Sequence, residues 1–173
     1  MEKAQLAKLV KDACYLTGEF TLRSGQISSF YWDKYRFESN PLLLSTITNQ
    51  LKPLLPLSFD KLAGLELGGI PIATALSIAT GKHCLYVRKA AKTYGTCNLV
   101  EGSYEVGDVV VAIEDVITTG GQVCTSVQQM RELGLVVHHA VCVIDRQQGG
   151  REALEAMDCS VASLFTLSEI EQY

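Results

Sequence analysis

The sequence predicts an α/β fold with a mostly parallel central sheet that is flanked by helices. Residues 61–67, 83–87, 109–113 and 136–144 form apolar runs with little or no alternation between apolar and polar residues. Such runs are typical of strands buried on both faces of a parallel sheet. Helical patterns lie between them, and strands that alternate with helices favour right-handed crossovers with helices on both faces of the sheet.

The N-terminal segment predicts a helix followed by a hairpin. In residues 3–14 apolar side chains recur at helical spacing, and Gly18 marks the expected helix stop. Residues 20–22 and 27–32 are interpreted as two short strands with Gly25 in the turn between them. The predicted buried face of the helix consists of Leu6, Leu9, Val10 and Ala13.

The hairpin also carries side chains that suit a planar ligand. Arg23 lies at the turn, and the run Phe30, Tyr31 and Trp32 places three aromatic rings together. These rings offer a flat surface for a planar base, but adjacent aromatics in a strand also face core and solvent alternately for purely structural reasons. Both interpretations of the aromatic run stay open at this point.

The next helix begins at Asn40, because a capping residue is followed by a proline at the first helical position. Its predicted buried stripe is Leu44, Ile47 and Leu51.

After the strand at 61–67, a glycine pair leads into a helix that runs toward Thr80. Gly68 and Gly69 permit either a close backbone approach to an anion or simply a tight turn, and the segment alone does not decide between them.

A basic segment follows the strand at 83–87. Arg88, Lys89 and Lys92 fall within five residues, and a helix there would have little to bury, so the segment 88–98 is predicted to be a loop. One interpretation is a solvated run of charge. The other is a loop that closes over a highly charged anion, where the exclusion of water would strengthen each charge contact several-fold.

The stretch 109–121 changes from apolar residues to polar ones at a single point. Glu114 and Asp115 follow the apolar run, and we expect them to emerge at the carboxyl edge of the sheet, because ionised side chains are rarely buried without partners. Thr118, Thr119, Gly120 and Gly121 come next, ahead of a helical pattern. Their amides and hydroxyls suit an anion at a helix N-terminus, so the stretch predicts a sugar-phosphate site.

The C-terminal third repeats the strand and helix plan. A helical stripe of Val123, Val127, Met130 and Leu133 ends at Gly134. The strand at 136–144 is followed by Arg146, which the same edge argument places in the crevice with the sugar-phosphate site. A short helix through Leu154 and a strand at 161–165 complete the predicted domain.

Composition narrows the class of protein. The chain has 173 residues, of which 47% are hydrophobic and 20% charged, which predicts a single globular domain over residues 1–173. The net charge of −4 argues against a general nucleic-acid binder. The six cysteines lack C-x-x-C spacing and no apolar run reaches membrane-spanning length, so we expect reduced thiols, a cytoplasmic location and no membrane partner.

Several motifs of other enzyme classes do not occur in this sequence. It contains neither the G-x-x-x-x-G-K-[ST] motif of P-loop NTPases nor a G-x-G-x-x-G after a strand. His83, His138 and His139 lack the spacing of metal ligands, and no nucleophile motif is recognised. A nucleotide-hydrolysing or metallohydrolase function is therefore disfavoured.

The segment 113–121 resembles the binding motif for phosphoribosyl pyrophosphate in type I phosphoribosyltransferases. Nearly all of the chain is similar to the orotate phosphoribosyltransferase branch of that family, on segments 19–31, 64–77, 88–102 and 145–150. The resemblance implies the type I fold with a small N-terminal helix-hairpin hood over about residues 1–38. It also implies transfer of a phosphoribosyl group to orotate, with release of pyrophosphate, in pyrimidine biosynthesis.

The resemblance further implies the roles of individual residues. The 5-phosphate would be held by the loop 118–121, the ribose hydroxyls by Glu114 and Asp115, and the pyrophosphate by the glycine pair and the basic loop. Arg146, Thr118, Arg23 and Tyr31 would bind orotate, since a guanidinium matches a carboxylate bidentately. The implied catalytic residues are Asp115 as a proton carrier, with Lys92 and Arg88 on the leaving pyrophosphate.

Cofactor and partners follow from the same resemblance. Mg²⁺ is expected to arrive on oxygens of the substrate and to keep waters, because the sequence shows no carboxylate cage of the protein's own. Family members are dimers, so loop 88–98 is expected to act in trans in a homodimer. Two alternatives stay open, namely a regulator that senses phosphoribosyl pyrophosphate without turnover, and a phosphoribosyltransferase for another base.

Overall fold

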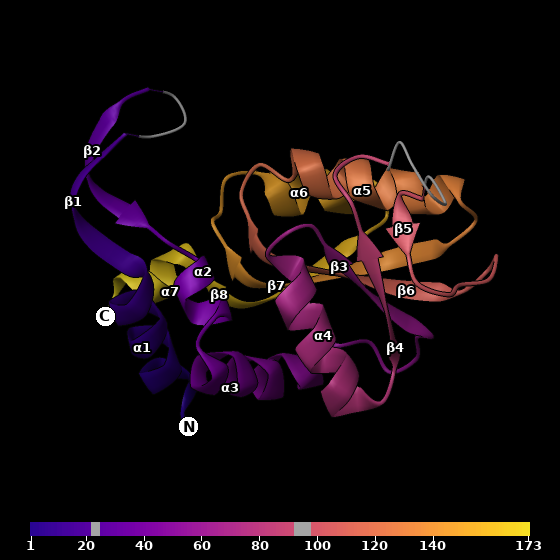
Figure 1. Ribbon diagram of the computed structural model, residues 1–173, viewed down its shortest axis with the longest axis horizontal. Helices are drawn as coiled ribbons and strands as arrows, with labels where there is room; N and C mark the ends of the chain where they lie inside the picture. The colour runs from indigo at the N-terminus through magenta and orange to yellow at the C-terminus, as the bar shows by residue number, and fades with distance from the viewer. Residues whose placement is uncertain (22–24, 92–97) are drawn as a thin grey trace.

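A computed structural model describes residues 1–21, 25–91 and 98–173 (Figure 1). Its helices are α1 (Lys3–Cys14), α2 (Tyr35–Glu38), α3 (Pro41–Leu51), the 3-10 turn η1 (Lys52–Leu54), α4 (Gly69–Thr80), α5 (Gly121–Glu132), α6 (Gly150–Glu155) and α7 (Leu167–Glu171). Its strands are β1 (Tyr15–Thr21), β2 (Ile27–Trp32), β3 (Lys61–Leu65), β4 (His83–Val87), β5 (Val100–Glu101), β6 (Val109–Ile117), β7 (Val136–Asp145) and β8 (Ser160–Thr166).

The main sheet of the described chain has six strands in the order β5-β4-β3-β6-β7-β8. All neighbouring strands are parallel except β5, which pairs antiparallel with β4 at one edge. From β3 the chain passes through α4 to β4 on one side, and from β6 it passes through α5 to β7 on the other. The strand order therefore reverses between β3 and β6, which is the point where open α/β sheets bind ligands.

Helices cover both faces of the sheet because alternate strand residues face opposite sides. On β6, Val111 and Ile113 join a core with α1, α3 and α4, whereas Val110 and Ala112 join a core with α5. Figure 1 shows α5 and α6 on one side of the sheet, with α1, α3 and α4 on the other. The predicted α/β fold with a mostly parallel, helix-flanked sheet is confirmed.

The N-terminal helix and hairpin are present, but their boundary differs from the prediction. The helix ends at Cys14 and Tyr15 begins β1 directly, so the prediction that the helix stops at Gly18 is wrong. Gly18 lies inside β1, where the pairing with β2 shifts register between Thr17 and Phe20. The two-stranded sheet of β1 and β2 projects beyond the main sheet (Figure 1), while α1 packs into the core with α3.

Several smaller expectations about helix faces and ends also need correction. Leu9 is 36% exposed and Leu133 is 38% exposed, so neither belongs to a buried helical stripe. Ala7 and Cys14 are buried on α1 instead. The short helices α2 and α7 had no periodic signal long enough to be read from the sequence, because each spans little more than one turn.

The described cysteines form no disulfide bonds. The cysteines at 14, 84, 124, 142 and 159 are free, and Cys97 lies outside the described residues.

Among the helices that the structure describes, none combines the length and the apolar character needed to cross a bilayer. The single-domain organisation, with residues 1–38 as a hood, stays a prediction.

The N-terminus of α3 offers a test of local stability. Oδ1 of Asn40 accepts hydrogen bonds from the amides of Leu42 and Leu43 at 3.0 and 3.2 Å. Asn40→Ala should therefore lower the free energy of unfolding by about 1 kcal/mol, measured by urea denaturation. Ser39→Ala is the matched control and should change it little, because no cap hydrogen bond by Ser39 is recorded at this helix in the described chain. Equal losses in the two variants would contradict the capping role.

Candidate functional site

Two cavities lie at the carboxyl ends of the central strands, where the strand order reverses. The first has a volume of about 340 Å³ and the second about 420 Å³. Both are bordered by Val116 near the end of β6. The first is lined by Lys34, Tyr35, Glu66, Leu67, Lys89, Glu114, Val116, Thr118, Thr119, Gly120, Gly121, Gln122 and Val123.

The predicted phosphate loop forms one wall of the first cavity. Thr118 to Gly121 connect β6 to α5, and Gly120 precedes the helix with a left-handed φ of 79°. A side chain at Gly150 would lie 2.4 Å from the carbonyl oxygen of Thr118, so the turn before α6 packs directly on this loop. The N-terminus of α5 and the exposed loop amides thus suit an anion.

The two carboxyl groups lie inside the strand rather than beyond it. β6 continues to Ile117, Glu114 is 8% exposed and Asp115 is 0% exposed. The expectation that both emerge at the sheet edge is therefore wrong. Glu114 still borders the first cavity, whereas Asp115 lines neither cavity. Burial of the Asp115 carboxyl group is possible because it has interaction partners in the segment between β2 and α3.

Lys34 and Glu38 are these partners, and sequence reasoning missed both. Nζ of Lys34 lies 2.5 Å from Oδ2 of Asp115. Apart from this ion pair, neither Oε1 of Glu38 nor Oδ2 of Asp115 meets a hydrogen-bond donor within the described residues. A proton on Glu38 would let its carboxyl group donate to the Asp115 carboxylate, which would give both oxygens a hydrogen-bond partner.

The electrostatics of this cluster favour one ionised carboxylate among three carboxyl groups. Burial, then the hydrogen bond with Asp115, raises the pKa of Glu38 to about 9. Burial and Asp115 also raise the pKa of Glu114 well above its usual value. Burial opposes ionisation of Asp115, but hydrogen bonds from both glutamates and the Lys34 charge lower the pKa of Asp115. Burial also opposes the charge on Lys34, yet Asp115 outweighs it and raises the pKa of Lys34.

The glycine pair after β3 allows the close approach of this loop to β6. A Cβ on Gly68 would lie 1.8 Å from Oδ2 of Asp115 and 2.9 Å from Oε1 of Glu38. A Cβ on Gly69 would lie 2.1 Å from the carbonyl oxygen of Ile113. Both glycines are thus needed for packing, and the cavity is lined by the preceding Glu66 and Leu67.

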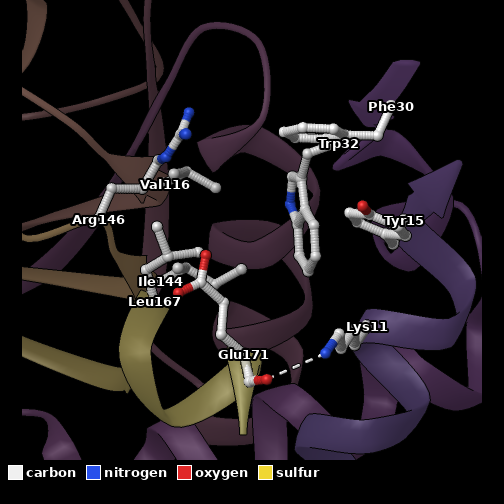
Figure 2. A pocket seen from close by; sticks show the side chains of 9 residues that line it. All are labelled: Lys11, Tyr15, Phe30, Trp32, Val116, Ile144, Arg146, Leu167 and Glu171. Atoms are coloured by element: carbon white, nitrogen blue, oxygen red, sulfur yellow. Dashed lines mark hydrogen bonds between the residues drawn. The ribbon is translucent and has the colours of Figure 1, made fainter. Parts of the chain in front are cut away.

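The second cavity lies between the hairpin and the end of β7 (Figure 2). Figure 2 shows Arg146 on one side and the rings of Phe30, Trp32 and Tyr15 on the other. Nζ of Lys11 donates to the carbonyl oxygen of Glu171 at 3.1 Å, beside the same space. The complete lining is Lys11, Tyr15, Phe30, Trp32, Val116, Ile144, Arg146, Leu167 and Glu171.

Strand alternation decides which aromatic residues face this cavity. Phe30 and Trp32 line it, and the rings of Phe30 and Tyr15 stack at 5.4 Å. Tyr31 packs instead against Phe20, with ring centroids 5.6 Å apart. Phe30 and Trp32 thus face this cavity and Tyr31 does not line it, because successive side chains of a strand point to opposite faces. The predicted contact of Tyr31 with a base stays a prediction.

A buried ion pair supports the loop that carries Arg146. Nε of Arg151 donates to Oδ2 of Asp145 at 3.0 Å, and Oδ1 of Asp145 accepts from the amide of Gln147 at 2.8 Å. Asp145 is 3% exposed, so its charge needs these donors. The amide of Arg146 also donates to the carbonyl oxygen of Ile117 at 2.9 Å, which ties Arg146 to the end of β6.

The basic segment is described only in part. Lys89 borders the first cavity, and its amide donates to Oε2 of Glu66 at 2.9 Å. Arg88 lies 3.7 Å from Glu101 and does not line that cavity. Lys92 and Arg23 lie outside the described residues. The described part of the segment thus brings one of the predicted cations to the site.

Chemically, the first cavity suits a phosphorylated sugar and the second a flat acid. Thr118 to Gly121 offer amides and hydroxyls opposite Lys34 and Lys89, while Arg146 faces aromatic rings across the second cavity. No cluster of three or more His, Cys, Asp or Glu side chains suited to a metal ion occurs among the residues described. Glu66 also brings carboxylate oxygens to the first cavity, a type of ligand that suits Mg²⁺.

Comparison with known proteins gives the family. No family model matches the chain. An orotate phosphoribosyltransferase from Nocardioides sp. is 48% identical over 168 residues, which cover 97% of this chain and 94% of that relative. The chain belongs to the orotate phosphoribosyltransferase family.

Solved structures of other orotate phosphoribosyltransferases share its fold. The enzyme of Aeropyrum pernix is 33% identical with a TM-score of 0.84, covering 96% of both chains. The Mycobacterium tuberculosis enzyme in complex with 5-phospho-alpha-D-ribosyl 1-diphosphate is 31% identical with a TM-score of 0.81, covering 98% of both chains. These similarities agree with the resemblance read from the central motif and the segments around it.

The protonated state of Glu38 gives a testable pH dependence. Its pKa is raised from the ordinary 4.5 to about 9, so the folded state must keep a proton that the unfolded chain loses. The stability contribution of that proton is complete below about pH 4.5 and is lost as pH rises toward about 9. The free energy of unfolding of the wild type should therefore fall relative to that of Glu38→Gln over this range.

Urea denaturation at about pH 5, 7 and 9 measures this difference. Glu152→Gln, which changes an exposed carboxyl group on α6, is the control, and its difference from the wild type should not grow with pH. A constant difference for Glu38→Gln would show that Glu38 is ionised in the folded protein.

Proposed function

We propose that this chain transfers the 5-phosphoribosyl group from phosphoribosyl pyrophosphate to orotate, giving orotidine 5′-monophosphate and pyrophosphate in pyrimidine biosynthesis. The observation that carries the proposal is the pair of adjacent cavities that share Val116. One has the chemistry of a phosphate site and the other the chemistry of a site for a planar acid. Membership of the orotate phosphoribosyltransferase family supports this assignment.

The phosphorylated donor is assigned to the first cavity. Thr118 to Gly121 would hold its 5-phosphate through loop amides at the N-terminus of α5. Glu114, which borders the cavity, is the carboxyl group placed to bond the ribose hydroxyls. Asp115, the expected proton carrier, lies behind Lys34, so no direct contact between Asp115 and the donor is proposed.

Orotate is assigned to the second cavity. The guanidinium of Arg146 would pair with the orotate carboxylate, and Phe30 and Trp32 would pack on the ring. The orotate nitrogen would then approach C1 of the ribose from the side of Val116. A bond from that nitrogen to C1 forms while the bond from C1 to the pyrophosphate oxygen breaks, and the proton of the ring N–H passes to a pyrophosphate oxygen or to water.

The leaving pyrophosphate requires positive charge. Lys89 lies at the first cavity, and Arg88 and Lys92 are proposed to join it when the basic segment closes and excludes water. Mg²⁺ bound to oxygens of the donor, with Glu66 at the same cavity, would neutralise charge on the leaving group. We also propose a homodimer, in which segment 88–98 acts in trans, and a cytoplasmic location.

A direct assay tests the function. The protein is mixed with orotate, phosphoribosyl pyrophosphate and Mg²⁺, and the orotate ultraviolet absorbance should fall as orotidine 5′-monophosphate forms. Binding of the donor without any absorbance change or pyrophosphate release would favour a regulatory sensor. Pyrophosphate release with another base but not with orotate would identify a different phosphoribosyltransferase.

The assignment of Arg146 predicts a selective loss. Arg146→Ala should raise the KM for orotate about tenfold or more, because the carboxylate loses a charge-assisted bidentate partner. The KM for phosphoribosyl pyrophosphate should change little, since Arg146 does not line the first cavity. Arg36→Ala is the control, because Arg36 is an exposed arginine paired with Asp33 outside both cavities. A large loss of affinity for phosphoribosyl pyrophosphate in Arg146→Ala would show that Arg146 binds the donor and not orotate.

A further inference from the structure

Lys34 stands at the boundary between a buried carboxylate and the first cavity. It immediately precedes α2, its side chain is 33% exposed, and it lines the same cavity as the loop Thr118 to Gly121. Its ammonium lies 2.5 Å from Oδ2 of Asp115, whose side chain is fully buried. One side of the ammonium is therefore neutralised inside the protein, while the other faces the space assigned to the donor.

The carboxylate behind Lys34 is fixed in place. Oδ1 of Asp115 accepts from the amide of Val116 at 2.6 Å, and Oδ2 faces Glu38 beside Gly68. The absence of a side chain at Gly68 leaves room for this arrangement, because a Cβ there would overlap Oδ2. Asp115 therefore cannot swing toward the cavity without breaking these contacts, and its charge holds the Lys34 ammonium at the cavity wall.

An ammonium so placed retains hydrogen-bonding capacity. Lysine has three N–H donors and no acceptor, and Asp115 takes the donor on the buried side. The same cavity is lined by Thr118 to Gly121, whose amides and hydroxyls lie at the N-terminus of α5. The ammonium and this loop thus both bring donors to a space of about 340 Å³, which suits an oxygen that carries negative charge.

We propose that Lys34 is a further substrate-binding residue, whose ammonium bridges the buried Asp115 carboxylate and a phosphoryl oxygen of the donor. The inference rests on the proposed function for the identity of the donor. The phosphoryl oxygen belongs either to the pyrophosphate or to the 5-phosphate, and both share the chemistry that Lys34 recognises. Asp115 and Glu38 act through Lys34 as positioning residues.

Isothermal titration of the full chain tests the contact directly. Lys34→Met should weaken the binding of phosphoribosyl pyrophosphate with Mg²⁺ about ten- to a hundredfold, as expected for loss of a charged hydrogen bond. The affinity of the variant should also depend less steeply on salt. Separate titrations with inorganic pyrophosphate and with ribose 5-phosphate then identify the contacted group, since only one of them should weaken in the variant.

A matched control is Lys61→Met. Lys61 forms an ion pair of 3.1 Å with Asp108 and is 17% exposed, but it begins β3, at the opposite end of the strand from the cavity. This variant should bind the donor like the wild type. Equal weakening by the two substitutions would attribute the effect to general charge or stability and overturn the proposal.

Removal of Lys34 also leaves Asp115 buried without its counter-ion, which destabilises the fold. A second comparison separates this effect from ligand contact. In an Asp115→Asn background no buried charge needs Lys34, so Lys34→Met should still weaken donor binding there if Lys34 touches the ligand. Unchanged binding between Asp115→Asn and Lys34→Met/Asp115→Asn would show that Lys34 is only a counter-ion.

The outcome is distinguishable from failure of the proposed function. If the wild type binds pyrophosphate or ribose 5-phosphate but does not consume orotate, the transferase assignment fails while the Lys34 contact is still measured. If the wild type consumes orotate and Lys34→Met binds and reacts as the wild type does, only the Lys34 proposal fails.

Discussion

The parallel pairing of β3 with β6 is the constraint on which the rest of the structure depends. Lys61 to Gly64 pair with Val110 to Ile113, and the chain then leaves the two strands toward opposite edges of the sheet. This divergence opens the crevice at their carboxyl ends. The approach is so close that a side chain at Gly69 would collide with the backbone of Ile113. The glycines after β3 are therefore required for the close packing of β3 against β6, and the cavity results from that packing.

Much of this architecture follows from local sequence pattern. Apolar runs predicted the buried strands, and the edge argument correctly brought Arg146 and the loop after β6 to one region, because strand ends of a parallel sheet meet. The true end of β6 was not predictable in the same way. Glu114 and Asp115 suggested a strand end because the sequence showed no partners with which these carboxyl groups could be buried. Lys34 and Glu38 lie some 80 residues earlier in the chain, and a local pattern does not reveal such a pairing.

The hairpin shows a different limit. Three consecutive aromatics indicated a surface for a base, but the period of two in a strand allows only alternate residues to share one face. Whether Tyr31 or its two neighbours face the cavity depends on the register between β1 and β2, which shifts at Thr17. Register is set by tertiary packing, so the sequence could name the aromatic run without choosing its functional face.

The buried cluster behind the first cavity would be costly if all of its carboxyl groups were ionised. Burial raises the pKa of Glu38 and of Glu114, whereas hydrogen bonds and the Lys34 charge lower the pKa of Asp115, so ionisation is favoured at Asp115. A single fixed carboxylate then anchors an ammonium whose free side faces the phosphate loop. Val116, the next residue on β6, borders both cavities, so the same short stretch of strand would position the proposed donor and acceptor. In the proposed assignment, such shared anchoring would hold the reacting nitrogen and C1 at a defined distance, which favours reaction.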